Sequence, residues 1–155
     1  MLFRSITEVE YRKIQLEKVV LAGVWVSGTW ESAERSLQEL ARLAQTAGSQ
    51  VLEGVIQRRD NPDPATYLGS GKALELRKIV AQTGADTVII DGELSPAQLI
   101  HLEDVVKVKV VDRTWLILDI FAKHAKSREG KIQVSLAQMQ YMLPRLRGWG
   151  ETLSR

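Results

Sequence analysis

The residues with the most pronounced chemical character are cations gathered around one short turn near the C-terminal end of the chain. Lys126, Arg128 and Lys131 lie in or beside residues 127–131, and Lys123 precedes them by about one helical turn. Cations held this close repel one another in the free protein, and an RNA phosphate surface relieves that repulsion by releasing counterions. These residues alone favour two interpretations equally: a turn that binds RNA or another anion, and a turn that is only solvated.

The cationic turn is predicted to join two antiparallel helices. Apolar residues recur at helical spacing on both sides of it: Leu116, Ile117, Ile120 and Phe121 before the turn, and Ile132, Leu136, Met139 and Leu143 after it. Gly130 suits the left-handed conformation that ends a helix and lets the chain reverse. Met139, Tyr141 and Met142 are predicted to fill the hairpin core, and Pro144 ends or kinks the second helix near Leu143.

A second candidate site is the stretch Gly69-Ser70-Gly71-Lys72, which leads into a helix predicted over residues 73–82. A phosphate-binding P-loop needs a longer glycine-bounded loop and a Ser or Thr after its lysine. Here Ala73 follows Lys72, and the required earlier glycine is absent. The helix start could still attract an anion. A weak nucleotide site and an ordinary turn with a solvated lysine therefore both stay open.

Two carboxylates, Asp91 and Glu93, follow a predicted strand. Open α/β sheets place their ligands at the carboxyl ends of strands, where such a pair could bind Mg²⁺ or act as acid and base. No nucleophile or histidine is paired with them, however, and Asp-Gly after a strand is also ordinary turn chemistry. His101 and His124 lack the spacing of metal ligands. No metal site and no catalytic residue are therefore predicted.

The bulk composition is that of one globular domain. The chain has 155 residues, 45% of them hydrophobic and 26% charged, with a net charge of +2. From Phe121 onward seven cations stand against two acids, so the basic excess lies at the C-terminal end. The absence of cysteine excludes disulfides and thiolate metal ligands. No apolar run has membrane-spanning length and no signal-peptide core is present, so we expect a cytoplasmic location.

Strand and helix patterns alternate up to the hairpin. Apolar, β-branched runs predict strands over residues 18–26, 50–56, 86–91 and 107–111. Helical spacing predicts helices over residues 30–47, 73–82 and 96–106. Thr29 and Ser95 are predicted N-caps, and Gly48 and Gly84 are predicted helix stops.

This alternation predicts an α/β fold: a small parallel four-stranded sheet flanked by helices, followed by a long antiparallel two-helix hairpin. The α/β subdomain is predicted to span residues 1–112, with residues 1–16 as a lead-in segment. The hairpin subdomain is predicted to span residues 113–148, and residues 149–155 are expected to begin a linker.

Three long stretches resemble the N-terminal domain of HflX-type ribosome-associated GTPases. They are PATYLGSGKALEL (residues 64–76), GADTVIIDGELSPAQLIHLE (84–103) and VKVVDRTWLILDIFAKHAKSREGKIQVSLAQMQYMLPRLRGWG (108–150). The resemblance implies a parallel α/β sheet that carries a helical hairpin and is followed by a GTPase domain. It also implies binding to the large ribosomal subunit, in splitting or rescuing stalled ribosomes under stress or in ribosome biogenesis.

The same resemblance places residues 127–131 at a tip that reaches ribosomal RNA near the peptidyl transferase centre. Lys126, Arg128 and Lys131 are expected to contact RNA phosphates, and Gly130 to set the reversal. Secondary contacts are expected from the remaining residues of the tip, Lys123, His124, Ser127 and Glu129.

Missing motifs decide what activity we expect of this chain. It has no complete P-loop and no guanine-reading Asn-Lys-x-Asp, so by itself it is not expected to hydrolyse GTP. GTP and Mg²⁺ are expected only with a GTPase domain, to which residues 149–155 would lead. Some family members are reported to bind ATP through this domain, which keeps an ATP site at residues 69–72, Asp91 and Glu93 open. A third alternative is a regulatory domain that docks on its own GTPase domain.

Overall fold

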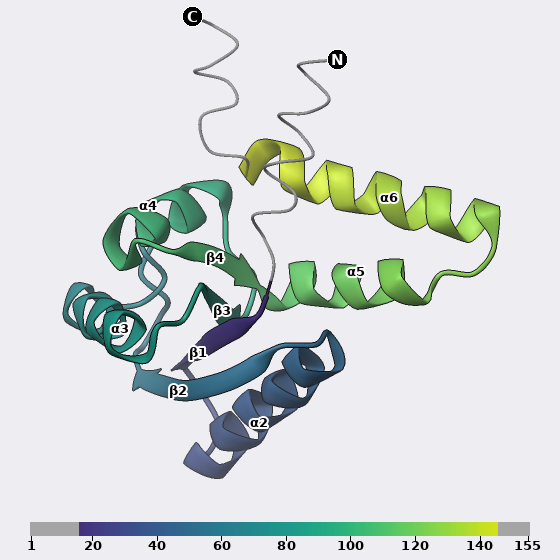
Figure 1. Ribbon diagram of the computed structural model, residues 1–155. Helices are drawn as coiled ribbons and strands as arrows, with labels where there is room; N and C mark the ends of the chain where they lie inside the picture. The colour runs from purple at the N-terminus through teal and green to yellow at the C-terminus, as the bar shows by residue number, and fades with distance from the viewer. Residues whose placement is uncertain (1–15, 146–155) are drawn as a thin grey trace, which may run out of the picture.

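The computed structural model describes residues 16–145, in which a four-stranded sheet carries helices on both faces and a helical hairpin projects to one side (Figure 1). The elements follow in the order β1 (Lys18–Trp25), α2 (Trp30–Thr46), β2 (Gln50–Arg58), α3 (Ser70–Thr83), β3 (Thr87–Asp91), α4 (Pro96–Val106), β4 (Lys109–Asp112), α5 (Arg113–His124), α6 (Arg128–Met142) and the 3₁₀ turn η1 (Leu143–Arg145). Among these helices none is long and apolar enough to cross a membrane.

The four strands are parallel and lie in the order β2-β1-β3-β4, which confirms the predicted parallel sheet. Residues 19–22 of β1 are buried because this strand lies inside the sheet and is covered on both faces. From β1 the chain continues to β2 on one side and later to β3 on the other. The carboxyl ends of β1 and β3 therefore form the topological switch point of the sheet, where α/β proteins bind ligands.

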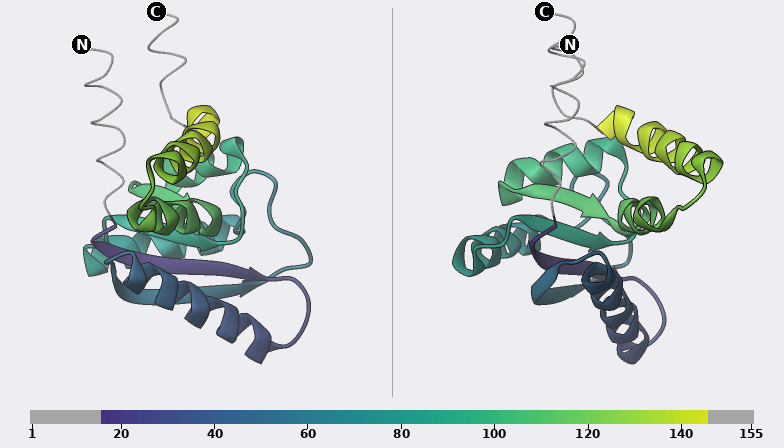
Figure 2. Two further views of the ribbon diagram at one scale, coloured as in Figure 1. Left: turned by 90° about the vertical axis from the view of Figure 1, so that its right-hand side faces the viewer. Right: turned by 45° about the vertical axis from the view of Figure 1, so that its right-hand side comes forward.

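Two hydrophobic cores cover the two faces of the sheet (Figure 2). On one face α3 and α4 pack through Leu76 and Leu102, which are fully buried. On the other face α2 and the first turns of α5 pack through Leu40 and Leu116, which are also fully buried. The nearly continuous apolar strands thus follow from a sheet that has helices on both sides.

The predicted helix caps are confirmed. The Thr29 side chain accepts a hydrogen bond from the backbone N–H of Ser32 at the start of α2. Ser95 and Gln98 form a reciprocal capping box at the start of α4. Gly84 ends α3 in the left-handed conformation, with φ 74°. These boundaries depend on local hydrogen bonding, which is why sequence patterns locate them.

The predicted starts of two elements are wrong by two or three residues. Helix α3 begins at Ser70 and not at residue 73, because Gly69 is its N-cap and Ser70, Gly71 and Lys72 form its first turn. The fourth strand begins at Lys109 and not at residue 107, because Lys107 ends α4 in the left-handed conformation with φ 66°. A left-handed lysine is uncommon, so sequence patterns do not anticipate this ending.

The hairpin begins at a buried carboxylate. Asp112 is the last residue of β4 and the N-cap of α5, and its side chain accepts from the backbone N–H groups of Trp115 (3.0 Å) and Leu94 (2.8 Å). The helix therefore starts directly from the sheet, without a linker. α5 and α6 then run antiparallel and project beyond the sheet, as the predicted hairpin requires (Figure 1).

The face of α6 that packs is not the one that the apolar pattern favoured. Met142 is buried and Tyr141 is half-buried in the core shared with α5, so both fill the hairpin core as predicted. Met139, however, is exposed, and the prediction that it fills the core is wrong. The other apolar residues of the same helical repeat, Ile132, Leu136 and Leu143, are exposed as well.

Candidate nucleic-acid interface and sheet-edge site

The turn at the hairpin tip depends on Ser127. α5 ends at His124, and Ala125 has extended backbone. Ser127 is the N-cap of α6, and its Oγ accepts from the backbone N–H of Gly130 at 3.0 Å. Gly130 lies in the first turn of α6 and has no positive φ, so the predicted left-handed reversal at Gly130 is wrong. The glycine instead leaves room for the cap, because a Cβ there would lie 2.9 Å from the Ser127 Oγ.

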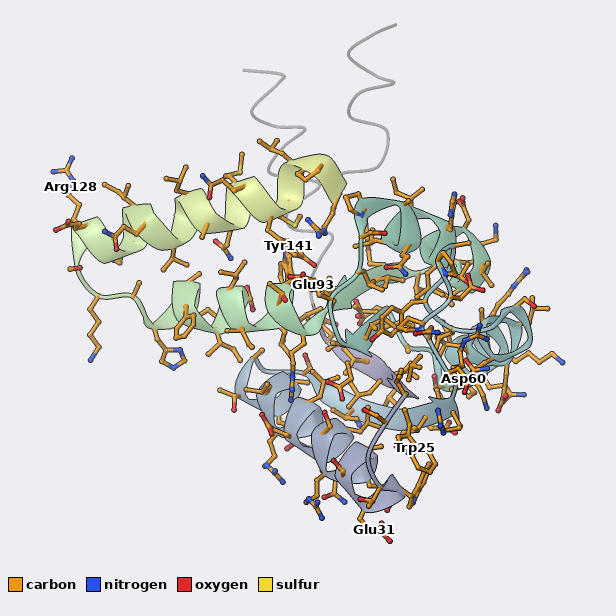
Figure 3. All side chains as sticks on the ribbon, turned by 180° about the vertical axis from the view of Figure 1, so that it is seen from behind. Trp25, Glu31, Asp60, Glu93, Arg128 and Tyr141 are labelled. Carbon is orange, nitrogen blue, oxygen red and sulfur yellow. The ribbon has the colours of Figure 1, made fainter. Side chains whose placement is uncertain are left out.

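Three cations are exposed at this tip. Lys126 precedes the N-cap, while Arg128 and Lys131 lie in the first turn of α6. Arg128 projects outward from the end of the hairpin, far from the sheet (Figure 3). Glu129 is the one acid in the first turn. The positive end of the α6 dipole lies at the same place, so cations and helix dipole together favour an anionic ligand.

Two other predicted tip residues, Lys123 and His124, have hydrogen-bond partners within the protein. The Lys123 ammonium lies 3.0 Å from the Asp119 carboxylate and donates to the carbonyl of Ala47 at 3.0 Å. It therefore joins α5 to the end of α2. The His124 Nδ1 lies 2.8 Å from the carbonyl of Ile120, one turn back in the same helix. Lys123 and His124 thus already have partners. Lys126, Arg128 and Lys131, which we call the outer cations, form no ion pair within residues 16–145.

The base of the hairpin is held by contacts that sequence reasoning missed. The Trp115 indole N–H donates to the Met142 Sδ at 2.8 Å. The Arg145 guanidinium donates to the carbonyls of Leu94 and Tyr141, each at 2.9 Å, and lies 3.9 Å from the centre of the Tyr141 ring. In the sequence, Arg145 counted only toward the basic excess. No local pattern indicates these partners, because they come together only in the folded chain.

Tyr141 is held neutral at this base. Burial raises the pKa of its hydroxyl, and the nearby carboxylate of Asp112 raises it further. Tyr141 and the loop residue Glu93 lie near one another where the hairpin meets the sheet (Figure 3). The Tyr141 ring packs in the core at the base of the hairpin and against the Arg145 guanidinium.

The stretch Gly69-Ser70-Gly71-Lys72 is a helix start, and it does not form a phosphate loop. The backbone N–H of Gly69 donates to Oε1 of Gln57 at 2.8 Å. The Lys72 ammonium lies 3.0 Å from the Glu75 carboxylate, so this lysine is ion-paired one turn along its own helix. Both groups that would approach a phosphate therefore have partners within the protein.

Asp91 and Glu93, predicted as a pair, each have partners of their own. Asp91 accepts from the Ser36 hydroxyl at 2.6 Å, and its other oxygen lies 3.5 Å from Nε of Arg113. Glu93 accepts from the Thr114 hydroxyl at 3.2 Å. Asp91 is thus bound into a network that joins β3 to α2 and α5. Glu93 belongs to the loop that precedes α4.

A pocket of about 260 Å³ lies at the topological switch point. Its walls are the end of β1, the start of α2 and the side chain of Asp91. Residues 69–72 do not line it. The structure therefore places Asp91 where α/β sheets bind ligands but separates it from Lys72. Across residues 16–145 no cluster of three or more potential metal-binding side chains occurs.

Sequence reasoning also missed two residues beside Asp91. Arg113 forms ion pairs with Asp91 and, at 3.2 Å, with Glu39 of α2. Tyr67 has a left-handed backbone, with φ 68°, and its hydroxyl occupies the space that a side chain on Gly92 would need. In the sequence only Gly92, a glycine directly after a buried strand, indicated that another group packs closely against the backbone there.

Two family models match the chain. One, described as GTP-binding GTPase N-terminal, matches residues 34–122, more than half of the 155 residues. The other, described as GTP-binding GTPase Middle Region, matches residues 124–155. The division between them falls at the end of α5, so α6 belongs to the second match.

Curated relatives are similar along most of the chain. The protein named GTPase HflX from Alkalihalophilus pseudofirmus is 45% identical over 146 residues, covering 94% of this chain and 34% of the relative. GTPase HflX from Escherichia coli is 42% identical over 134 residues, covering 86% of this chain and 31% of the relative. The chain thus spans about a third of the length of these relatives.

A solved structure shares the fold. It is a GTP-binding protein from the hyperthermophilic archaeon Sulfolobus solfataricus, in complex with GDP. The likeness has a TM-score of 0.63 at 26% sequence identity and covers 89% of this chain and 40% of the other.

Proposed function

Because this chain belongs to the HflX family of GTPases, we propose that it is a cytoplasmic ribosome-binding module whose hairpin tip contacts ribosomal RNA of the large subunit. The contact lies near the peptidyl transferase centre and serves ribosome splitting, rescue or biogenesis under stress. Lys126, Arg128 and Lys131 contact RNA phosphates, and Ser127 holds the turn that presents them.

The observation that carries this proposal is the isolation of the outer cations. Lys126, Arg128 and Lys131 are exposed at the far end of the hairpin and form no ion pair with another described residue. Lys123, in contrast, is already ion-paired with Asp119. Unpaired cations on a narrow projection can approach phosphates without first losing a protein partner.

The anchored base supports the same proposal. The Trp115–Met142 contact joins α5 to α6 at the base of the hairpin, and the Arg145–Leu94 contact joins that base to the sheet domain. A projection that is held at its base loses less conformational freedom on binding than a free loop does. The geometry thus favours a preformed probe for a structured RNA surface.

Sedimentation with purified large ribosomal subunits across a salt series tests the proposal. We expect binding that weakens steeply as salt rises, because RNA contacts release counterions. The double change Arg128→Glu and Lys131→Glu should remove most of the binding. The matched control is Arg77→Glu with Lys78→Glu, the same charge change at exposed positions of α3. This control should bind as the parent chain does, and circular dichroism should show all three folded.

The tip model is abandoned if the Arg128/Lys131 variant binds as well as its α3 control. Binding that stays constant with salt would also count against it, because that result means no phosphate contact. Equal losses in both variants would point to net charge and not to the tip.

We assign GTP chemistry to sequence outside these 155 residues. The sequence contains no complete P-loop and no Asn-Lys-x-Asp. Relatives named GTPases are about three times as long as this chain. GTP, with its Mg²⁺, is therefore a ligand of the remaining part of such proteins, and this chain alone should show no GTP turnover.

A second candidate function is ATP binding at the sheet edge, and one observation favours it. The pocket of about 260 Å³ lies at the switch point, with Asp91 in its wall. Lys72 does not line that pocket. ATP bound there should be lost with Asp91→Asn and retained with Lys72→Ala. Equilibrium dialysis with the parent chain that shows no ATP binding dismisses this candidate.

A further inference from the structure

Three side chains with flat groups meet at the carboxyl edge of the sheet. Trp25 is the last residue of β1, Arg58 is its partner at the end of β2, and Trp30 is the first residue of α2. The Arg58 guanidinium lies 5.3 Å from the centre of the Trp25 ring. The Trp25 and Trp30 rings meet edge to face, with their centres 5.6 Å apart. We call Trp25, Trp30 and Arg58 the aromatic ladder.

The aromatic ladder is held in place by hydrogen bonds to the backbone. The Trp25 indole N–H donates to the carbonyl of Gly28 at 3.0 Å, across the turn that leads into α2. Gly28 has φ 82°, a conformation that glycine adopts without strain. The Arg58 guanidinium donates to the carbonyl of Trp25 at 3.2 Å and to the carbonyl of Arg59. Side chains that are fixed in advance lose less conformational freedom when a ligand binds.

Two members of the ladder are open to solvent. The Trp30 side chain is 44% exposed, although its ring contacts Trp25. Arg58 is exposed and forms no ion pair within residues 16–145. An exposed ring and an unpaired cation thus both adjoin the Trp25 ring.

This combination suits an unpaired base of a nucleic acid. In the loops and bulges of RNA, unpaired bases stack on aromatic rings and on guanidinium planes, and arginine also binds the phosphates between them. The centre of a protein interface, in contrast, is surrounded by contacts that exclude water. The exposed residues next to Trp30 in the chain are polar or glycine, so they offer no such apolar surround: Ser27, Gly28, Thr29, Glu31 and Ser32.

An open hollow of about 470 Å³ continues the surface beyond Arg58. Arg59, Asp60, Asn61 and two prolines complete its lining. The Arg59 Nε donates to the carbonyl of Asn61 at 3.0 Å, and its guanidinium lies 3.9 Å from the Asp63 carboxylate. Arg59 is therefore partly neutralised, and Asp60 adds a negative charge. Stacking, with one phosphate contact from Arg58, should contribute more to binding here than net charge does.

We propose that the aromatic ladder stacks unpaired bases of single-stranded RNA. Trp30 is the stacking ring, Arg58 binds the adjoining phosphate, and the hollow receives the next nucleotides. Trp25 and Arg128 lie far apart on opposite sides of the molecule, so the ladder and the hairpin tip are separate surfaces (Figure 3). Trp30 and Arg58 do not line the pocket beside Asp91. The proposal therefore depends neither on RNA binding at the tip nor on ATP binding in that pocket.

Fluorescence anisotropy with a dye-labelled oligoadenylate of about ten nucleotides tests the proposal. The 155-residue chain used as the parent carries Arg128→Glu and Lys131→Glu, so that the hairpin tip does not contribute. We expect binding with a salt slope of about −0.7, the share of one phosphate on a single strand. Trp30→Ala should weaken binding about five- to 150-fold, and Trp30→Phe should restore most of it. Arg58→Ala should weaken binding and abolish the salt slope.

The matched control is Phe121→Ala, which removes a ring that is 59% exposed but belongs to α5. It should bind the oligoadenylate as the parent does, and circular dichroism should show every variant folded. A parent that does not bind the oligoadenylate overturns the proposal, and so do equal affinities for Trp30→Ala and Phe121→Ala. Equal affinity for a duplex of the same length overturns it too, because paired bases are not free to stack on Trp30.

Discussion

The indole N–H of Trp115 donates to the Sδ of Met142 across 2.8 Å, although the two residues are 27 positions apart. Trp115 lies in the first turn of α5 and Met142 is the last residue of α6, so this contact closes the base of the hairpin. Both side chains belong to the core on one face of the sheet. The hairpin is therefore a continuation of that core, and only its far part projects.

Met142→Ala should destabilise the protein by about 2–5 kcal/mol, since it leaves a cavity at the base and removes the partner of Trp115. Met139→Ala, on the exposed face of the same helix, is the matched control and should cost less than about 1 kcal/mol. Urea unfolding followed by far-UV circular dichroism gives both values. Equal losses in the two variants would show that the base is not packed as described.

Asp112→Ala should cost about 2–4 kcal/mol, because it removes the N-cap of α5 and leaves the buried N–H groups of Leu94 and Trp115 without an acceptor. Asp112→Asn keeps one acceptor oxygen and should cost less. Hydrogen exchange of the Trp115 amide, measured by NMR, should accelerate in the alanine variant. An unchanged exchange rate there would contradict the cap.

Gly130→Ala distinguishes the observed turn from the one that sequence reasoning predicted. Alanine favours the helix by about 1 kcal/mol, and its Cβ displaces the Ser127 cap, which is worth about the same. The net change in unfolding free energy should therefore be less than about 1 kcal/mol. A left-handed glycine would instead make alanine cost about 1–2 kcal/mol. Thermal and urea unfolding decide between these values.

Alkaline pH should destabilise the protein through Tyr141. Burial raises the pKa of Tyr141 above its ordinary value of 10.0, so the folded state keeps a proton that the unfolded state loses. This contribution is complete below pH 10.0 and is lost as pH rises above it, with a slope of at most about 1.4 kcal/mol per pH unit. Tyr141→Phe should flatten that slope in urea unfolding at several pH values. Parallel slopes for parent and variant would refute the assignment.

Arg128→Ala and Lys123→Ala should separate the tip from the base. Arg128→Ala should reduce the salt slope of ribosome binding by about 0.7–0.9, the share of one phosphate contact, with stability unchanged. Lys123→Ala should leave that slope unchanged. It should lower stability by no more than about 1 kcal/mol, because its ion pair with Asp119 is largely exposed on the lysine side. If instead Lys123→Ala lowered the salt slope and Arg128→Ala did not, the RNA contact would lie nearer the base of the hairpin than its tip.

Sequence patterns predicted the alternating elements and most of their ends. The strand over β1 and the caps at Thr29 and Ser95 depend on hydrophobic runs and on hydrogen bonds within a few residues. The exceptions have local causes too. Lys107 and Tyr67 adopt left-handed backbone that is rare for their residue types, so a pattern based on ordinary preferences misses them.

One candidate site could be predicted from nearby residues in the sequence, and the other could not. The outer cations could be placed at the tip from the sequence, because they sit within a few residues of one turn. The partners of Asp91 could not, since Ser36 is 55 positions away and Arg113 belongs to the element after the last strand. Lys72 and Asp91 looked like parts of one site in the sequence, but Lys72 is paired with Glu75 and does not line the pocket that Asp91 lines.

The sequence by itself determined that Ile132, Leu136, Met139 and Leu143 form one apolar stripe, because helical periodicity places them on one side. Only the tertiary structure decided that this stripe faces outward. α6 has apolar residues on two faces, and periodicity cannot say which of them meets α5. That choice depends on the Ser127 cap, which sets how the chain reverses, and on Trp115 and Met142, which meet only once the chain has folded.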